Sequence, residues 1–407
     1  MRFKRRRSRS ESASTSISER IALSIDTSFE ASTCPIARST SWLNGSDGTD
    51  SNAAIAKLLG QKVLLVVDCR GMHRTIAALI NGLQQFDTDV QFAGVILNRI
   101  RSARHGSKVR TAIAEHTSLQ VLGEIPETDS VHIAEKQLGL VPAPEFHNNT
   151  ACIESIAAVV RDHVNVESLF SGVARAPQQT TGTPISAPAG TGNATLTIGI
   201  AKDEAFHFYY HDDLEALRNR GVTLREVSPL HDDFPADLDG LLIGGGFPER
   251  HAAALQSNAG FRQALKSAIE AGLPVHAECG GLMYLCNSLQ IDKHSFAMVG
   301  IFDAEVAMLT KPVGRGYVRL RRLADNAVIA AHEFHHSKAH FNTPQPFTHM
   351  VERGYGIDGN HDGVSRYNAH ASYAHVRHTQ RTPWVDEFLA LVQHSAYQQP
   401  ANAGVAR

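Results

Sequence analysis

The chain has 407 residues, of which 43% are hydrophobic and 20% charged, and its formal net charge is −2 at pH 7. This length allows two domains, and the near-neutral charge argues against nucleic acid as a partner. No apolar run approaches the roughly 20 residues that cross a bilayer, so we expect no membrane span. The five cysteines have neither metal-type nor disulfide-type spacing, which fits a cytoplasmic protein.

The first residues, MRFKRRRSRSESASTSISER, combine a basic run with a serine-rich stretch. Their composition predicts a disordered tail over residues 1–45. A basic run at this place can also indicate nucleic-acid contact, a targeting signal or a misassigned start. We favour a solvated tail, because the rest of the chain has no basic bias. Residues 396–407 are also predicted to be disordered.

The sequence pattern of residues 46–170 is typical of an α/β domain. Uninterrupted Val, Ile and Leu runs between helical segments are typical of a parallel sheet covered on both faces. The expected strands are 62–68, 92–98 and 121–125. The expected helices are 51–59, 72–86, 108–116, 133–137 and 150–165.

Residues 171–194 are rich in Pro, Gly, Thr and Ala, which predicts a linker. A second α/β domain follows over residues 195–395. Its expected strands are 195–201, 223–228, 240–243, 273–278, 299–308, 316–323 and 328–334. Its expected helices are 214–220, 261–271 and 383–393.

The most informative segment of the second domain is HAECGGLMYL, which places Cys279 between a buried strand and an apolar helix. A strand-to-helix elbow exposes its central side chain, and the following glycines permit the strained turn. A helix N-terminus lowers the pKa of a cysteine and offers N–H groups to an oxyanion. We therefore interpret Cys279 as a nucleophile; the alternative is a buried structural cysteine.

Three further segments bear on Cys279. The turn GGGFPE follows a strand, so its glycines can bring backbone N–H groups toward a carbonyl oxygen. His375, in ASYAHV, is a candidate for the base that a cysteine nucleophile requires. The segment HEFHH (332–336) matches H-E-x-x-H, but a zinc site needs both histidines on one face of a helix. The preceding AVIAA run predicts a strand instead, so we favour a polar strand edge over a zinc peptidase site.

GGGFPE, HAECGGLMYL, HEFHHS and ASYAHV, in this order, resemble the glutamine amidotransferase domain of cobyrinic acid a,c-diamide synthases. Upstream, DSNAAIAKLLG, VLLVVD, GVILNR, QVLGEIP and LGLVPAPE resemble the synthetase domain of the same enzymes. The resemblance covers about residues 47–395. It implies a P-loop-type, dethiobiotin-synthetase-like parallel-sheet domain, truncated here, followed by a class I glutamine amidotransferase-like domain.

The resemblance implies that Cys279 attacks glutamine to form a thioester, with His375 as general base and later acid. Gly245, Gly246 and Gly280 would form the pocket for the glutamine carbonyl. Glu333 and His335 belong to a segment shared by the family and are expected near the cleft. Arg377 stands where many triad amidotransferases have Glu. A Cys–His dyad is therefore expected, without an identified orienting carboxylate.

For the first domain, the resemblance implies that ATP with Mg²⁺ phosphorylates carboxylates of a tetrapyrrole in cobalamin biosynthesis and that ammonia then displaces phosphate. Asn98 would recognise adenine, and Asp68 ends a strand at the same sheet edge, where open α/β sheets bind ligands. No metal bound by the protein itself is implied. The substrates would be glutamine and the tetrapyrrole, and the oligomeric state is left open.

The sequence departs from the family pattern at its start. It contains no G-x-x-x-x-G-K-[ST] loop to hold the ATP phosphates. We therefore expect an impaired synthetase half, which would fit a truncated gene product, a remnant or a chain completed by a partner. Two other functions remain open: amidation of sirohaem, which the segments GRGYVRL and GIDGNHDG suggest by resemblance to sulfur-oxidation relatives, and a non-catalytic binding or assembly role.

Overall fold

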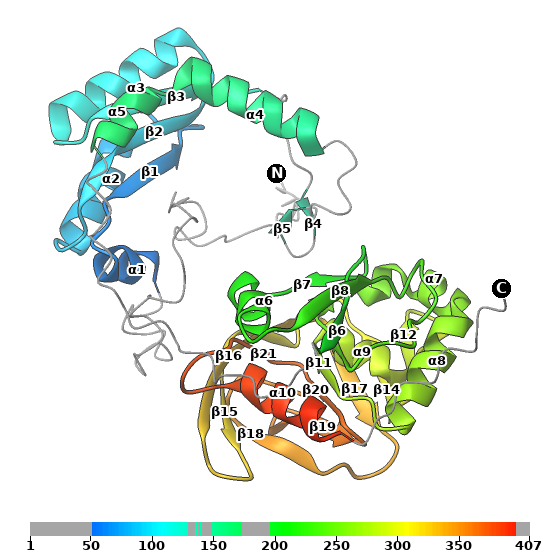
Figure 1. Cartoon of the computed structure of the whole chain (residues 1–407). Coiled ribbons are helices and arrows are strands. Elements are labelled where there is room, and N and C mark those ends of the chain that lie inside the picture. The colour runs from blue at the N-terminus through cyan, green and yellow to red at the C-terminus, as the bar shows by residue number, and fades with distance from the viewer. Residues whose placement is uncertain (1–50, 129–134, 137–138, 141–148, 173–195, 396–407) are drawn as a thin grey trace, which may run out of the picture. The chain divides into compact units, whose positions relative to one another are not determined.

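A computed structural model of the chain describes residues 51–128, 135–136, 139–140, 149–172 and 196–395 (Figure 1). The described residues form two compact units, residues 51–172 and residues 196–395. The predicted tails, and all but two residues of the predicted linker, lie outside the described residues. Among the residues that are described, no helix is long and apolar enough to cross a membrane.

The first unit contains a parallel sheet in the order β1-β2-β3, as the apolar strands predicted. The strands are β1 (Val63–Asp68), β2 (Phe92–Ile100) and β3 (Val121–Pro126). The described helices are α1 (Asn52–Leu58), α2 (Thr75–Phe86), α3 (Ala103–His116), α4 (Asn149–His163) and α5 (Val166–Gly172).

Both faces of this sheet are buried, which explains why its strands are apolar without alternation. On one face, Leu65 and Leu97 pack with residues of α1, α2 and α3. On the other face, Leu64 and Ile96 pack with residues of α4 and α5. The helix predicted at 133–137 is wrong where the chain is described, because Glu135–Lys136 forms β4 and pairs with β5 (Gly139–Leu140).

The second unit is built on a sheet that has ten strands in the described part of the chain. Its order is β21-β16-β15-β18-β19-β20-β11-β9-β6-β8, and the segment from β20 to β8 is parallel. From one edge to the other, the strands are β21 (His375–Val376), β16 (Val328–His335), β15 (Gly314–Arg322), β18 (Phe347–Arg353), β19 (His361–Arg366), β20 (Ala369–Ser372), β11 (Val275–Glu278), β9 (Gly240–Ile243), β6 (Thr197–Ala201) and β8 (Thr223–Val227).

Helices cover both faces of the parallel part (Figure 1). Successive residues of β9 point to opposite sides: Leu241 and Ile243 join one core, and Leu242 joins the other. The first core includes α7 (Ala252–Ser257), α8 (Ala259–Glu270) and α9 (Gly280–Leu285). The second includes α6 (His211–Arg218) and α10 (Trp384–His394). The unit is therefore a three-layer α/β sandwich with an antiparallel extension.

Smaller elements complete the second unit. A four-stranded sheet has the order β13-β12-β14-β17, and a two-stranded one pairs β10 with β7. Their bounds are β13 (His294–Ala297), β12 (Cys286–Ile291), β14 (Phe302–Met308), β17 (Ser337–Phe341), β10 (Gly245–Gly246) and β7 (Phe206–Phe208), and the 3-10 helix η7 (Pro248–Arg250) follows β10. The β-rich stretch predicted after Cys279 is confirmed as β14, β15 and β16.

Candidate active site

Cys279 occupies the turn between β11 and α9, as the elbow predicted. Its φ of 49° and ψ of −99° are strained for a residue with a Cβ atom. Its backbone N–H donates to the Ser372 carbonyl over 2.7 Å, which ties the turn to β20. A Cβ at Gly281 would come within 2.2 Å of the Ile243 carbonyl oxygen, so the tight elbow requires glycine there. Since α9 has only six residues, we expect its dipole to contribute little.

His375 begins β21, and a buried carboxylate fixes the turn that leads to it. Asp362 is 0% exposed and accepts hydrogen bonds from the backbone N–H groups of Gly363, Tyr373 and Ala374 at 2.8–3.0 Å. On the other side, β21 pairs with β16, where His375 lies opposite His332. The long sequence separation between Cys279 and His375 is therefore closed by β20 and this turn.

Glu278, the residue before Cys279, contacts His375 directly. Its Oε2 lies 3.2 Å from Nδ1 of His375, and its Oε1 accepts the backbone N–H of Val376 at 3.0 Å. Oε1 also lies 3.3 Å from Nε2 of His276. The sequence left any orienting carboxylate unidentified, and in the structure Glu278 is a carboxylate that contacts His375. The carboxylate comes from β11, and sequence reasoning missed it because it was sought two residues after the histidine.

Arg377 occupies that other position and turns away from His375. Its Nε donates to Oδ2 of Asp212 over 2.7 Å, and its guanidinium lies 5.7 Å from the centre of the Tyr210 ring. The side chain at position 377 is thus part of a surface ion pair, and Glu278 is the carboxylate that reaches the imidazole.

The charges around His375 favour its protonated form. Burial lowers its pKa, but the hydrogen bonds and charges of Cys279 and Glu278 outweigh burial and raise it to about 10. Burial raises the pKa of Glu278, and hydrogen bonds from His276 and His375 more than reverse that effect and lower it. At neutral pH the site therefore contains an imidazolium beside a carboxylate.

His332 and Phe208 hold the His375 ring from two directions. The rings of His332 and His375 stack with centroids 4.8 Å apart, and the Phe208 ring meets His375 edge-on at 4.9 Å. Nδ1 of His332 lies 2.8 Å from the Tyr210 hydroxyl. Burial, followed by the charge of His375, lowers the pKa of His332 to about 4. His332 is therefore neutral and packs against His375 without adding a competing charge.

The predicted glycines lie against the same groups. A Cβ at Gly245 would come within 2.5 Å of Cε1 of His375. A Cβ at Gly280 would lie 3.1 Å from the backbone nitrogen of Gly246. The structure thus brings Gly245, Gly246 and Gly280 together with His375 at one end of the parallel strands.

Glu333 and His335 lie behind this site and support it. Glu333 accepts hydrogen bonds from the backbone N–H groups of Tyr355 and Gly356 at 2.6 and 2.8 Å. The His335 ring stacks on Tyr373, in the turn before His375, with centroids 3.8 Å apart. Both residues lie on β16, so the strand predicted for H-E-x-x-H is confirmed. Within the described residues no group of three His, Cys, Asp or Glu could hold a metal ion.

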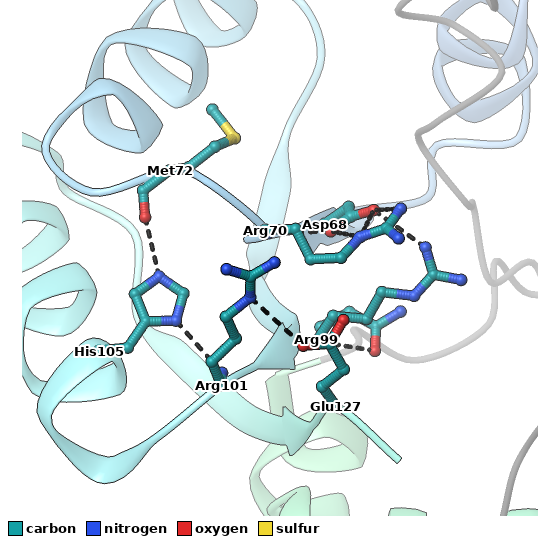
Figure 2. Close-up of polar contacts among 8 residues, drawn as sticks. Asp68, Arg70, Met72, Arg99, Arg101, His105 and Glu127 are labelled. Atoms are coloured by element: carbon teal, nitrogen blue, oxygen red, sulfur yellow. Dashed lines mark hydrogen bonds and ion pairs between the residues drawn. The ribbon is translucent and has the colours of Figure 1, made fainter. Parts of the chain in front are cut away.

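In the first unit, Asp68 and Asn98 lie side by side at the ends of β1 and β2. Figure 2 shows the polar contacts around them. The carboxylate of Asp68 pairs with Arg70 at 2.8 Å and with Arg99 at 3.1 Å. Beside them, Nε of Arg101 lies 3.4 Å from Oε2 of Glu127 (Figure 2). The predicted pair is therefore adjacent, within a cluster of arginines that sequence reasoning did not single out.

Two family models match the chain, one for each unit. A CobB/CobQ-like glutamine amidotransferase domain matches residues 197–383, and an AAA domain matches residues 39–134. Among solved structures, PurLQS from Thermotoga maritima has a TM-score of 0.38 at 14% identity, covering 48% of this chain and 98% of that one. That score is too low to support a conclusion, so the assignment depends on the family models and on sequence relatives.

Three of the similar proteins are cobyrinate a,c-diamide synthases. The one from Magnetococcus marinus is 36% identical over 87% of this chain and 78% of its own length. The one from Listeria monocytogenes is 35% identical over 84% and 77%, respectively. The one from Archaeoglobus fulgidus is 37% identical over 80% and 72%. With both units matched, the chain belongs to the cobyrinate a,c-diamide synthase family of glutamine-dependent amidating ligases.

Proposed function

We propose that the second unit releases ammonia from glutamine with Cys279 as the nucleophile. The sulfur attacks the side-chain amide carbon, and the C–N bond breaks to leave a thioester and ammonia. Water then attacks the thioester, and glutamate and the free thiol are restored. The single observation that supports this most strongly is that Cys279 stands on a strained elbow directly after Glu278, whose carboxylate contacts the buried His375.

His375 supplies and removes the protons of these two steps. Because its pKa is raised to about 10, the resting imidazole of His375 already carries a proton. His375 therefore acts first as the acid that protonates the departing nitrogen and then as the base that activates water. This reverses the order in which the sequence alone assigned the two roles.

The glycine turn provides the electrostatic part of the reaction. Gly246 and Gly280 approach closely, so their backbone N–H groups are our candidates for holding the oxygen that becomes negative during attack. Gly245 leaves room for the His375 ring beside that oxygen. Side chains larger than hydrogen at these positions would fill the space in which the glutamine amide has to lie.

The first unit would use the ammonia to amidate side-chain carboxylates of cobyrinate, as the names of the relatives indicate. ATP would transfer its terminal phosphate to a carboxylate, and ammonia would displace phosphate to leave an amide. Repetition at a second carboxylate gives a diamide. We propose that Asn98 contacts the adenine and that Asp68 lies near the nucleotide, since both stand at the carboxyl edge of the sheet.

The sheet edge around Asp68 and Asn98 offers some, but not all, of the groups that a bound nucleotide needs. Arg70 and Arg99 offer positive charge, but the described residues hold no metal-type cluster, and the sequence has no phosphate loop. We propose that this chain by itself binds Mg-ATP more weakly than proteins with a phosphate loop do. Isothermal titration of the full chain tests this, and tight binding would contradict it.

Ammonia release from glutamine tests the first stage. We expect Cys279→Ala to lower it by at least about 10³-fold while the fold is kept; undiminished release would refute the nucleophile assignment. For the second stage, cobyrinate is incubated with Mg-ATP and either glutamine or an ammonium salt, and the mass of the product is read. Sirohaem serves as the comparison substrate. Amidation of sirohaem but not of cobyrinate would overturn the proposed substrate.

A further inference from the structure

We propose that Glu278 is the positioning residue of the glutaminase centre, holding the imidazole of His375 by Nδ1 so that Nε2 faces Cys279. The proposal depends on the glutaminase function above, because it gives Glu278 a role only if Cys279 and His375 carry the reaction. It adds a third member to the centre, at a position next to the nucleophile in the chain.

The hydrogen-bond geometry supports this assignment. An imidazole has two ring nitrogens, and Nδ1 of His375 already lies 3.2 Å from Oε2 of Glu278. With Nδ1 taken by Glu278, Nε2 is the ring nitrogen left to interact with Cys279, a group that helps to raise the pKa of His375. A carboxylate on Nδ1 fixes the ring orientation and stabilises the imidazolium, the task that an acid performs in other triads.

Glu278 is itself held in place on both oxygens. Its Oε1 accepts the N–H of Val376 and lies 3.3 Å from Nε2 of His276. His276 in turn stacks on Trp384 with ring centroids 4.5 Å apart. The carboxylate thus has no freedom to turn away from His375, and its negative charge is paired within the protein.

The pH profile of glutamine hydrolysis also depends on the charged and titratable groups that face His375 and Glu278. Around His375 these are Glu278, Cys279 and His332. Around Glu278, besides His375, they are His276, His332, His370, Tyr209, Tyr210 and Asp213. Burial raises the pKa of Asp213 to about 7, so Asp213 also titrates near neutral pH and needs its own control.

The test is Glu278→Gln, which keeps the size and one acceptor oxygen but removes the charge. We expect kcat for glutamine hydrolysis to fall by about 10²–10⁴ with KM within about twofold. The alkaline limb of kcat/KM should move to lower pH, because the imidazolium loses its carboxylate partner. Alkylation of Cys279 by iodoacetamide, followed at this peptide by mass spectrometry, should slow at pH 6 by about tenfold.

Three variants keep the test decisive. Glu278→Asp retains the charge and should keep the alkaline limb in place while recovering part of kcat. Asp213→Asn removes a neighbouring buried carboxylate that makes no contact with His375, and it should leave the limb unmoved. If Glu278→Gln does not fold, Glu278→Ala replaces it: this removes the same charge and should move the limb in the same direction.

The outcomes separate the two proposals. If Cys279→Ala still releases ammonia, the glutaminase assignment fails whatever Glu278 does. If Cys279→Ala is inactive but folded Glu278→Gln retains the wild-type kcat, alkaline limb and alkylation rate, only the role of Glu278 is overturned. A fall in kcat with an unmoved limb would also overturn it, since that pattern indicates a general structural effect.

Discussion

Gly245 and His375 lie so close that a single added carbon would not fit between them: a Cβ at position 245 would come 2.5 Å from Cε1 of the imidazole. The glycine turn and the histidine lie far apart in the second unit's sequence, yet each limits the position of the other. This contact explains why the turn after β9 must be free of side chains.

Gly245→Ala should therefore displace the His375 ring. We expect kcat for glutamine hydrolysis to fall by about 10- to 100-fold, since small misplacements of a catalytic group are costly. Gly260→Ala is the matched control, because a Cβ there meets nothing within 4 Å and the residue lies in α8. That variant should keep full activity. Equal activities of the two variants would show that Gly245 does not constrain the histidine.

The strained backbone at Cys279 predicts a stability difference between two inactive variants. Only glycine adopts a φ of 49° with a ψ of −99° without strain. Cys279→Gly should unfold with a free energy about 1 kcal/mol higher than Cys279→Ala. Chemical denaturation of both variants measures this difference. A less stable glycine variant would mean that the elbow is not strained in solution.

Asp362 should matter for both stability and activity. Asp362→Ala leaves three buried backbone N–H groups without their acceptor, which we expect to cost about 3–5 kcal/mol of unfolding free energy. Since two of these groups precede His375, the folded fraction should also hydrolyse glutamine more slowly. Urea unfolding and an assay corrected for folded protein check the two effects, and a loss below about 1 kcal/mol would contradict the first.

Buried histidines should weaken the fold in mild acid. Burial, followed by neighbouring histidine charges, lowers the pKa of His370 to about 3; burial, followed by the charge of Arg322, lowers that of His349 to about 4. Below pH 6.5 these histidines bind protons in the unfolded chain but stay neutral in the folded protein. The free energy of unfolding therefore decreases as the pH is lowered. We expect a loss of about 1–2 kcal/mol per histidine between pH 7 and pH 5. His370→Gln should remove the part of this loss that His370 causes. An unchanged dependence of the unfolding free energy on pH would contradict the prediction.

The ion pair of His375 has the opposite effect on the pH dependence of stability: it makes the free energy of unfolding decrease as the pH rises. Because its folded pKa is raised to about 10, its stabilising contribution is complete below pH 6.5 and is lost as pH rises toward 10. The wild-type protein should lose about 3 kcal/mol more than His375→Asn between pH 6 and pH 9. Denaturant midpoints of both proteins at the two pH values provide the comparison, and parallel changes would argue against the pair.

Much of this architecture follows from local sequence patterns. The apolar runs of β1, β2 and β3 and the strand, cysteine and glycines around position 279 are contiguous signals, and the structure places them as predicted. The segment near Glu135 misled the sequence reasoning, which predicted a helix where the structure has the short strand pair of β4 and β5.

Other features depend on contacts that no local pattern reveals. Glu278 meets His375 across 97 positions of the sequence, and Asp362 reaches the turn before His375 from β19. A carboxylate beside a candidate nucleophile was visible in HAECGG, but only the pairing of β11 with β20 shows that it faces the histidine. Likewise, the arginines around Asp68 gather only when β1 and β2 align.

The adjacency of Glu278 and Cys279 reduces what the fold has to arrange. The nucleophile and the acid that contacts the histidine share one peptide unit, so their mutual placement is set by covalent geometry. Only one further stretch, from Asp362 to Val376, must be brought to them. A designer who wished to graft only the Cys279, Glu278 and His375 side chains onto another α/β scaffold, apart from the glycine turn, would therefore need to match two chain segments instead of three.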